Sequence, residues 1–180
     1  LSKITLADFT MHFATRGVAA NTLAREMTSA NAMLNYAREI GMDVPEIKLK
    51  KPSYDDTRTR WLYKSEMDAL IDACPLGIKS LTSFLFYTGA RLGEATSLRW
   101  RDIVEDSAIF SSRKGRSKKV RRRSVKLSPA LLSLLPKRGG SNDYVFTNAL
   151  GNKWDRKHFY KHFYRACDAA GIEDFKPHDC

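Results

Sequence analysis

The sequence is short of the features that mark several protein classes. Its 180 residues contain three cysteines, Cys74, Cys167 and Cys180, whose odd number and wide spacing argue against a disulfide framework and favour a reducing compartment. No apolar run is long enough to span a bilayer, and the first residues lead directly into an amphipathic segment. We therefore expect neither a membrane span nor a signal peptide. The chain does not begin with methionine, which indicates a piece of a longer or processed protein.

Acidic residues are also few in this sequence. Lysine and arginine number 31 against 20 aspartate and glutamate, which gives a net charge of +11. Such an excess attracts polyanions, and nucleic acid is the commonest of them. A membrane surface is a weaker alternative, because no insertion-competent apolar face accompanies the basic residues. The scattered carboxylates do not indicate a two-metal nuclease, and no glycine-rich phosphate loop indicates an NTPase.

The apolar patterns predict a mainly α fold with a small antiparallel β-sheet, an α+β class. Thr5 and Asp8 predict a capping box for a first helix, and a second helix is predicted from near Asn21 to Gly41. These two helices make a thin core, so residues 1–44 are expected to be part of a small helical domain. Proline and charge dominate residues 45–60, which are predicted to be a linker, and residues 61–180 form the second domain.

The second domain is predicted to begin with a helix that Ser65 or a neighbouring residue caps and that ends near Cys74. An apolar helix follows, buried on several sides and ended by Gly89 at a positive φ. Residues 107–112 and 120–127 predict a β-hairpin with a long basic tip. Ser128-Pro129 opens a short helix, and an apolar stripe predicts a last helix that ends at Gly171.

The most informative segment is Thr88-Gly89-Ala90-Arg91-Leu92-Gly93-Glu94-Ala95, which continues to Leu98-Arg99-Trp100-Arg101-Asp102-Ile103. It places Arg91 at a junction between two helices, close to the core, where the side chain loses few rotamers on binding. A guanidinium held in this way suits the grip of a phosphate. In the alternative interpretation, Arg91 pairs with Glu94 or another carboxylate and only stabilises the junction. Glu94, Arg99 and Arg101 are expected to face solvent or partners.

This segment resembles the first catalytic-arginine box of the tyrosine recombinases, the phage-integrase family of enzymes that break and rejoin DNA. The resemblance implies a partial core-binding domain, a tether and a truncated catalytic domain that close around double-stranded DNA. It implies that Arg91 binds the scissile phosphate and that a tyrosine forms a 3′-phosphotyrosyl intermediate, without metal or cofactor. It further implies a homo-tetramer on paired sites, in the cytoplasm or nucleoid of a bacterial host.

The predicted hairpin is strongly basic. From Arg113 to Lys126, nine of fourteen residues are lysine or arginine and none is acidic. This density favours a polyanion-binding ribbon over a merely solvated strand. In the resembling family a hairpin lysine protonates the 5′-oxygen leaving group, and Lys114 is the candidate, with Arg113 as the alternative. The expected DNA contacts are Arg113, Arg116, Lys118, Lys119, Arg121, Arg122 and Arg123.

The last residues, Phe175-Lys176-Pro177-His178-Asp179-Cys180, resemble the start of the family's His-x-x-Arg box. The resemblance implies that His178 assists proton transfer around the phosphate. The second arginine, the third-box histidine or tryptophan and the nucleophile have no match, and none of the seven tyrosines stands in the nucleophile's place. We therefore expect these 180 residues to bind DNA without cleaving it. A non-catalytic nucleic-acid-binding module derived from a degenerate recombinase is the alternative.

A zinc site is conceivable at His158 and His162, which are four residues apart, with Cys167 nearby. No closed Cys/His spacing supports it, and a helix face in contact with solvent or DNA is the favoured interpretation. No metal is therefore expected.

Overall fold

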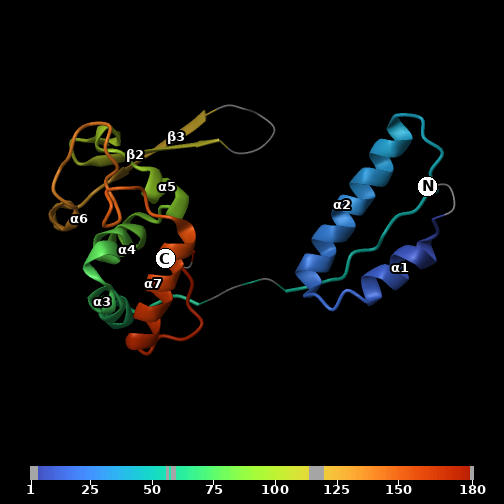
Figure 1. The fold of residues 1–180 in the computed structure, drawn as a ribbon, viewed down its shortest axis with the longest axis horizontal. Coiled ribbons are helices and arrows are strands. Elements are labelled where there is room, and N and C mark those ends of the chain that lie inside the picture. Colours follow the sequence, from blue (N-terminus) through green and yellow to red (C-terminus); the bar gives the residue numbers. More distant parts are fainter. Residues whose placement is uncertain (1–3, 56, 58–59, 114–119, 179–180) are drawn as a thin grey trace. The chain divides into compact units, whose positions relative to one another are not determined.

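The computed structural model describes residues 4–55, 57, 60–113 and 120–178, which divide into two compact units, 1–59 and 60–180 (Figure 1). Each unit is described by itself. Helices dominate both, and the second unit adds a three-stranded antiparallel sheet, which confirms the predicted fold class. Among the described residues, no helix combines the length and the apolar character that crossing a bilayer requires.

The first unit contains helices α1 (Leu6–Ala14) and α2 (Ala20–Glu39). The predicted capping box is confirmed, because Thr5 Oγ1 accepts the Asp8 N–H at 3.3 Å and Asp8 Oδ2 accepts the Thr5 N–H at 2.7 Å. Helix α2 begins one residue before its predicted start and ends at Glu39, two residues before its predicted end. These boundaries depend on local signals, which is why the sequence located them well.

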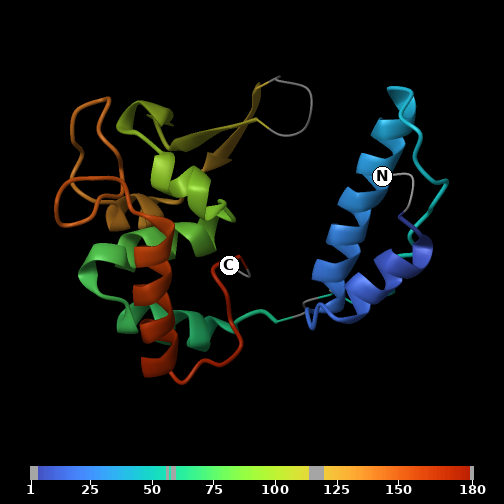
Figure 2. The same cartoon turned by 45° about the vertical axis from the view of Figure 1, so that its right-hand side comes forward.

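The segment after α2 runs back along the helices of the same unit (Figure 2). Ile47 and Leu49 are buried while Lys48 and Lys50 are exposed, an alternation that marks an extended segment with one face against the core. The Asn31 side chain donates to the Leu49 carbonyl at 3.0 Å and accepts the Leu49 N–H at 2.8 Å. The first unit is thus packed beyond residue 44, and the predicted linker of residues 45–60 begins inside it.

In the second unit, α7 (Arg156–Ala169) packs against α3 (Lys64–Ala73) and α4 (Leu76–Thr88). Two further helices are short, α5 (Leu92–Ser97) and α6 (Pro129–Leu134). As predicted, α4 is buried on several sides, with Leu81, Phe84 and Leu85 fully buried.

The cap of α3, predicted at Ser65 or a neighbouring residue, lies two residues before Ser65. Tyr63 holds the cap position, and the carboxylate of Glu66 accepts the Tyr63 backbone N–H at 2.9 Å. Ser65 lies within the first turn of the helix, so its hydroxyl is too far along the chain to serve as the cap. The capping contact comes instead from the carboxylate of Glu66, at the third position of the helix.

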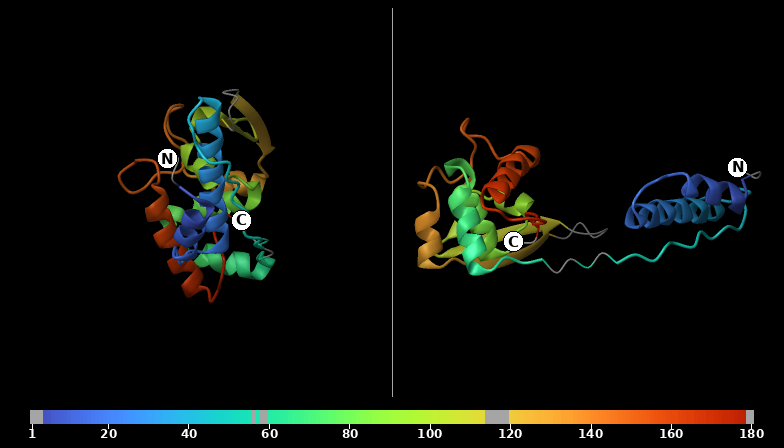
Figure 3. Two further views of the ribbon diagram at one scale, coloured as in Figure 1. Left: turned by 90° about the vertical axis from the view of Figure 1, so that its right-hand side faces the viewer. Right: turned by 90° about the horizontal axis from the view of Figure 1, so that it is seen from below.

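The sheet has the order β1 (Ile103–Val104), β2 (Ser107–Arg113), β3 (Val120–Lys126), and the 3₁₀ turn η1 (Trp100–Asp102) precedes it. The predicted hairpin is therefore present, and its ribbon extends away from the helices of its unit (Figures 1 and 3). Strand β2 sends Ala108 and Phe110 into the core, whereas β3 is mostly exposed. The register pairs Phe110 with Arg123, which sets that arginine beside the start of α5.

Cys74 and Cys167 are free thiols in the core of the second unit. Burial, with a smaller contribution from Cys74, raises the pKa of Cys167 to about 11. Burial also raises the pKa of Cys74, although a hydrogen bond with Thr82 acts in the other direction. Both thiols are therefore protonated at neutral pH, and they serve as small apolar core residues.

Candidate active site

The turn between α4 and α5 fixes the backbone of Arg91. Helix α4 ends at Gly89, whose φ of 57° lies in the left-handed region that glycine adopts without strain. Thr88 Oγ1 donates to the Phe84 carbonyl at 2.5 Å and accepts the Ala90 N–H at 3.3 Å, which holds the turn. Ala90 and Leu92 are buried on either side of Arg91, while the Arg91 side chain is 62% exposed. The backbone is therefore anchored and the guanidinium remains accessible.

Glu94 anchors that guanidinium. Its carboxylate accepts the Arg91 Nη1–H and the Arg91 backbone N–H, each at 3.0 Å, and a bond from Arg123 Nη2 at 2.8 Å. The Glu94 side chain is only 10% exposed, so it does not face solvent, which was one of the two alternatives predicted for it. The ion pair between Arg91 and Glu94 that the alternative interpretation predicted is thus present. It occupies one edge of the guanidinium, and the remaining donors of Arg91 stay free of Glu94.

Arg123 completes this charge cluster from β3. Its guanidinium lies 4.6 Å from the centroid of the Phe110 ring and pairs with Glu94. Burial by itself would raise the pKa of Glu94, but hydrogen bonds from Arg123 and from the backbone and side chain of Arg91 outweigh it and lower that pKa. Glu94 therefore stays ionised, and one negative charge between two guanidiniums leaves a net positive cluster.

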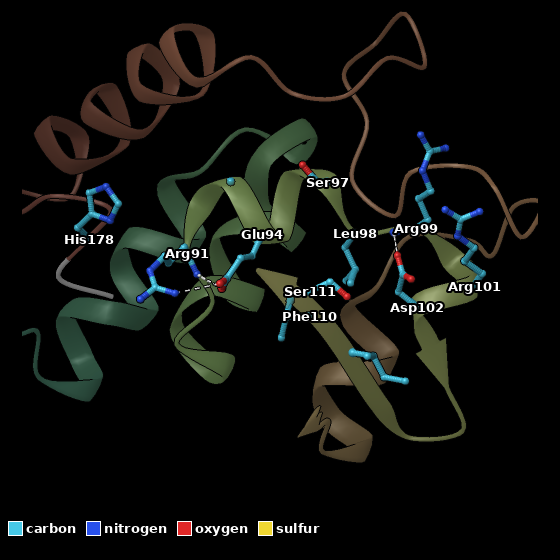
Figure 4. A pocket seen from close by; sticks show the side chains of 12 residues that line it. Arg91, Glu94, Ser97, Leu98, Arg99, Arg101, Asp102, Phe110, Ser111 and His178 are labelled. Atoms are coloured by element: carbon cyan, nitrogen blue, oxygen red, sulfur yellow. Dashed lines mark hydrogen bonds and ion pairs between the residues drawn. The ribbon is translucent and has the colours of Figure 1, made fainter. Parts of the chain in front are cut away.

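Arg91 opens onto a groove of about 740 Å³ between α5 and β2 (Figure 4). His178 lines the same groove, and Figure 4 shows it at the end where Arg91 lies. Ser97, Leu98, Phe110 and Ser111 contribute hydroxyl and apolar surface between the two ends of the groove. The structure thus brings the two catalytic candidates that it describes, Arg91 and His178, to one concave surface.

A second hollow of about 350 Å³ lies beside the groove and shares Gly93 and His178 with it. Its rim includes Lys153, whose Nζ donates to Ser97 Oγ at 2.9 Å, and Arg156, whose guanidinium lies 5.1 Å from the Tyr160 ring centroid. Sequence reasoning missed Lys153 and Arg156, because nothing near them in the chain signals their approach to α5.

The remaining predicted site residues lie on the hairpin. Arg121 and Arg122 are exposed on β3, whereas Arg123 is turned to Glu94. Lys114, Arg116, Lys118 and Lys119 lie outside the described residues, and Arg113 is placed only as the last residue of β2.

The zinc ligands considered on α7 have other contacts. His158 Nδ1 lies 3.1 Å from Asp155 Oδ1 at the start of the helix, and the His162 ring packs edge-on against Trp154 at 5.9 Å between centroids. Cys167 is buried in the core. Within the described ranges, no three histidine, cysteine, aspartate or glutamate side chains are grouped as metal ligands.

Residues 60–180, more than half of the chain, match the sequence pattern of the phage integrase family. The chain belongs to this family. It is 31% identical over 182 residues to the integrase of Salmonella phage P22, an alignment that covers 93% of this chain and 46% of that integrase. This integrase-family chain thus spans about half the length of the curated relative that it matches.

Solved structures of integrases share its fold. A lambda integrase dimer bound to a COC′ core site has a TM-score of 0.76 at 16% identity, covering 99% of this chain and 55% of that one. The XerH site-specific recombinase bound to its difH substrate has a TM-score of 0.63 at 19% identity, covering 99% of this chain and 58% of XerH. At these identities the likeness shows a common fold.

Proposed function

We propose that this chain is the DNA-binding part of a site-specific tyrosine recombinase that breaks and rejoins DNA through a 3′-phosphotyrosyl intermediate. The observation that carries the proposal is the placement of Arg91, anchored on one edge by Glu94 yet exposed to a groove that it shares with His178. Family membership supports it. So do the DNA complexes of lambda integrase and XerH, whose fold this chain shares.

In the proposed reaction, Arg91 binds the non-bridging oxygens of the scissile phosphate. The bond to Glu94 restrains rotation of the guanidinium, so little conformational entropy is lost when a phosphate arrives. Negative charge builds on those oxygens in the pentacoordinate transition state, and a fixed cation stabilises it more than the ground state. The lowered pKa of Glu94 keeps its carboxylate ionised and the anchor intact at neutral pH.

We assign proton transfer to two further residues. His178, exposed at the Arg91 end of the groove, is in a position to exchange a proton with an oxygen of the phosphate. Lys114 is the proposed acid for the 5′-oxygen leaving group, and its neighbour in the sequence, Arg113, is the alternative. The cations supply the charge stabilisation that a metal ion gives other phosphoryl-transfer enzymes, so we propose neither a metal nor a cofactor.

The basic ribbon and the first unit are proposed to hold duplex DNA. The ribbon's contacts are Arg113, Arg116, Lys118, Lys119, Arg121 and Arg122. Residues 1–44, with the segment to Leu49 that packs against them, are proposed as part of a core-binding domain tethered to the catalytic unit. A homo-tetramer on paired sites is proposed for the intact protein, in line with a lambda integrase tetramer bound to a Holliday junction. The proposed location is the cytoplasm of a bacterial host.

The chain by itself is proposed to bind DNA without cleaving it, because its 180 residues contain no match to the second arginine or the nucleophile. Fluorescence anisotropy with a labelled duplex tests binding. If about five phosphates are neutralised, the logarithm of the association constant falls with the logarithm of salt concentration at a slope of about −4 to −5. Absent binding or a flat salt dependence contradicts the proposal. A covalent protein–DNA adduct on a denaturing gel contradicts the proposal that the chain does not cleave DNA.

The alternative is a non-catalytic binding module, and the gene sequence after Cys180 distinguishes the two. A recombinase requires an arginine directly after Cys180, then a histidine or tryptophan box and a tyrosine. Where these are encoded, the longer product is expected to form the adduct. Arg91→Ala should abolish adduct formation, whereas Arg165→Ala, which removes an exposed arginine on α7 that lines neither hollow, should preserve it. A stop codon at that place favours the binding module.

A further inference from the structure

The groove has a second cationic end that the proposed reaction does not use. Arg99 and Arg101 line it after the end of α5, and Figure 4 shows them opposite the end that holds Arg91 and His178. We propose that Arg99 and Arg101 form a second phosphate-binding point for the same DNA backbone, beyond the phosphate held by Arg91. This inference rests on the proposed function, because it takes the occupant of the groove to be DNA.

Both guanidiniums are held by one loop residue. Arg101 Nη1 donates to Asn142 Oδ1 at 2.8 Å, and Arg99 Nη1 donates to the Asn142 carbonyl. Arg99 Nη2 also donates to the Tyr144 hydroxyl at 3.0 Å, and its guanidinium lies 4.2 Å from the Tyr144 ring centroid. Neutral acceptors and an aromatic ring thus hold two positively charged side chains near each other. The two guanidiniums repel each other, and a bound anion would relieve that repulsion.

The guanidiniums of this end are not held in side-chain ion pairs. Neither Arg99 nor Arg101 forms an ion pair with any carboxylate among the residues that the structure describes. The nearby carboxylate of Asp102 accepts the backbone N–H of Arg99 at 3.0 Å and so is used to hold the turn. At the other end, by contrast, Arg91 shares Glu94. With Asp102 counted, two guanidiniums and one carboxylate leave the second end net positive, as the Arg91, Arg123 and Glu94 cluster leaves the first.

The remaining donors suit a phosphate. An arginine has five N–H donors, and the contacts above use two on Arg99 and one on Arg101, so several donors of each remain. Arg101 is exposed and Arg99 is half-buried. Guanidiniums with spare donors in a fixed fork match the oxygens of a phosphodiester.

The length of the groove favours a run of backbone over a single anion. Its volume of about 740 Å³ greatly exceeds one phosphodiester group, and its two cationic ends are separated by Ser97, Leu98 and Phe110. A nucleic-acid strand repeats its charge at every nucleotide, so a strand held at Arg91 presents further phosphates along the same surface. Arg99 and Arg101 would thereby fix the direction in which the strand leaves the reaction centre.

The test compares Arg101→Ala with Arg165→Ala, which removes the same charge from an exposed site outside both hollows. Duplex binding is measured by anisotropy over a range of salt concentrations. Loss of one phosphate contact is expected to make the salt slope shallower by about 0.9 for Arg101→Ala, with the Arg165→Ala slope unchanged. Asn142→Ala keeps both charges but frees Arg101, so it should weaken binding with a smaller change in slope.

Thermal unfolding of each variant verifies that the second unit still folds. Equal slopes for Arg101→Ala and Arg165→Ala would overturn the inference, because the removal of Arg101 would then have no more effect than the removal of an exposed arginine outside the groove. In that case, binding of the duplex by the wild-type chain would still support the proposed function. Failure of the wild-type chain to bind any duplex would instead remove the proposed function and this inference together.

Discussion

Arg123 and Glu94 are 29 positions apart in the sequence, yet the guanidinium of Arg123 lies 2.8 Å from the Glu94 carboxylate. The same carboxylate holds Arg91, so two arginines from different elements share one acid. Arg123 was predicted to contact DNA along with its neighbours. Its contacts with Glu94 and Phe110 suggest that it also sets the charge balance around Arg91.

Arg123→Ala is therefore expected to weaken DNA binding through Arg91. Without Arg123, Glu94 pairs with Arg91 alone and the cluster becomes nearly neutral. The loss should be about 0.5–1 kcal/mol, roughly two- to fivefold in affinity. A double-mutant cycle checks the route. In an Arg91→Ala background the effect of Arg123→Ala should disappear, whereas an undiminished effect would show that Arg123 contacts DNA directly.

Glu94 should make stability depend on pH in the acid range. Its pKa is lowered on folding from the ordinary value of 4.5, so its contribution is complete above that value and is lost as pH falls through the lower folded-state pKa. Glu94→Gln should therefore destabilise the second unit at pH 7, by about 1–3 kcal/mol, and much less near pH 3. Urea unfolding followed by tryptophan fluorescence measures this, because Trp61, Trp100 and Trp154 all belong to that unit. A gap between variant and wild type that is constant with pH would contradict the assignment.

Two glycines near Arg91 should respond to alanine with opposite signs. Gly89 has a φ of +57°, so Gly89→Ala should cost about 1 kcal/mol or more although no atom obstructs the added Cβ. Gly93 lies in α5 at an ordinary helical φ with open space around its Cβ position, so Gly93→Ala should stabilise by about 0.5 kcal/mol. Unfolding measurements compare the two directly. Equal effects would mean that backbone conformation is not what Gly89 supplies.

The core thiols should be inert in the folded chain. Burial raises the pKa values of Cys167 and Cys74, and only the thiolate reacts with alkylating reagents. In a Cys180→Ser variant, we expect no alkylation by iodoacetamide at pH 7 in buffer and two alkylated cysteines in denaturant. Mass spectrometry counts the labels. Rapid labelling of the native variant would show that this core opens readily.

Local features of the second unit could be predicted from sequence. The turn at Gly89, the hairpin and the short helix that begins at Pro129 all depend on signals within a few residues, such as a glycine, a cap or an alternation. Arg91 could be predicted as a site residue because several apolar and glycine positions around it match the first catalytic-arginine box of the tyrosine recombinases. The packing of Ile47 and Leu49 escaped notice because two alternating apolar residues among prolines and lysines are a weak signal.

The sequence by itself determined the family, the helical framework and the placement of an arginine at a rigid turn, because caps, glycines and hydrophobic periodicity act between near neighbours. Tertiary structure decided which charges meet. Arg123 reaches Glu94 because the burial of Phe110 sets the register of β2 against β3. Arg101 reaches Asn142 across 41 positions because the loop of residues 141–145 hydrogen-bonds along residues 98–101. Such pairings depend on packing between distant segments, and no local pattern encodes them.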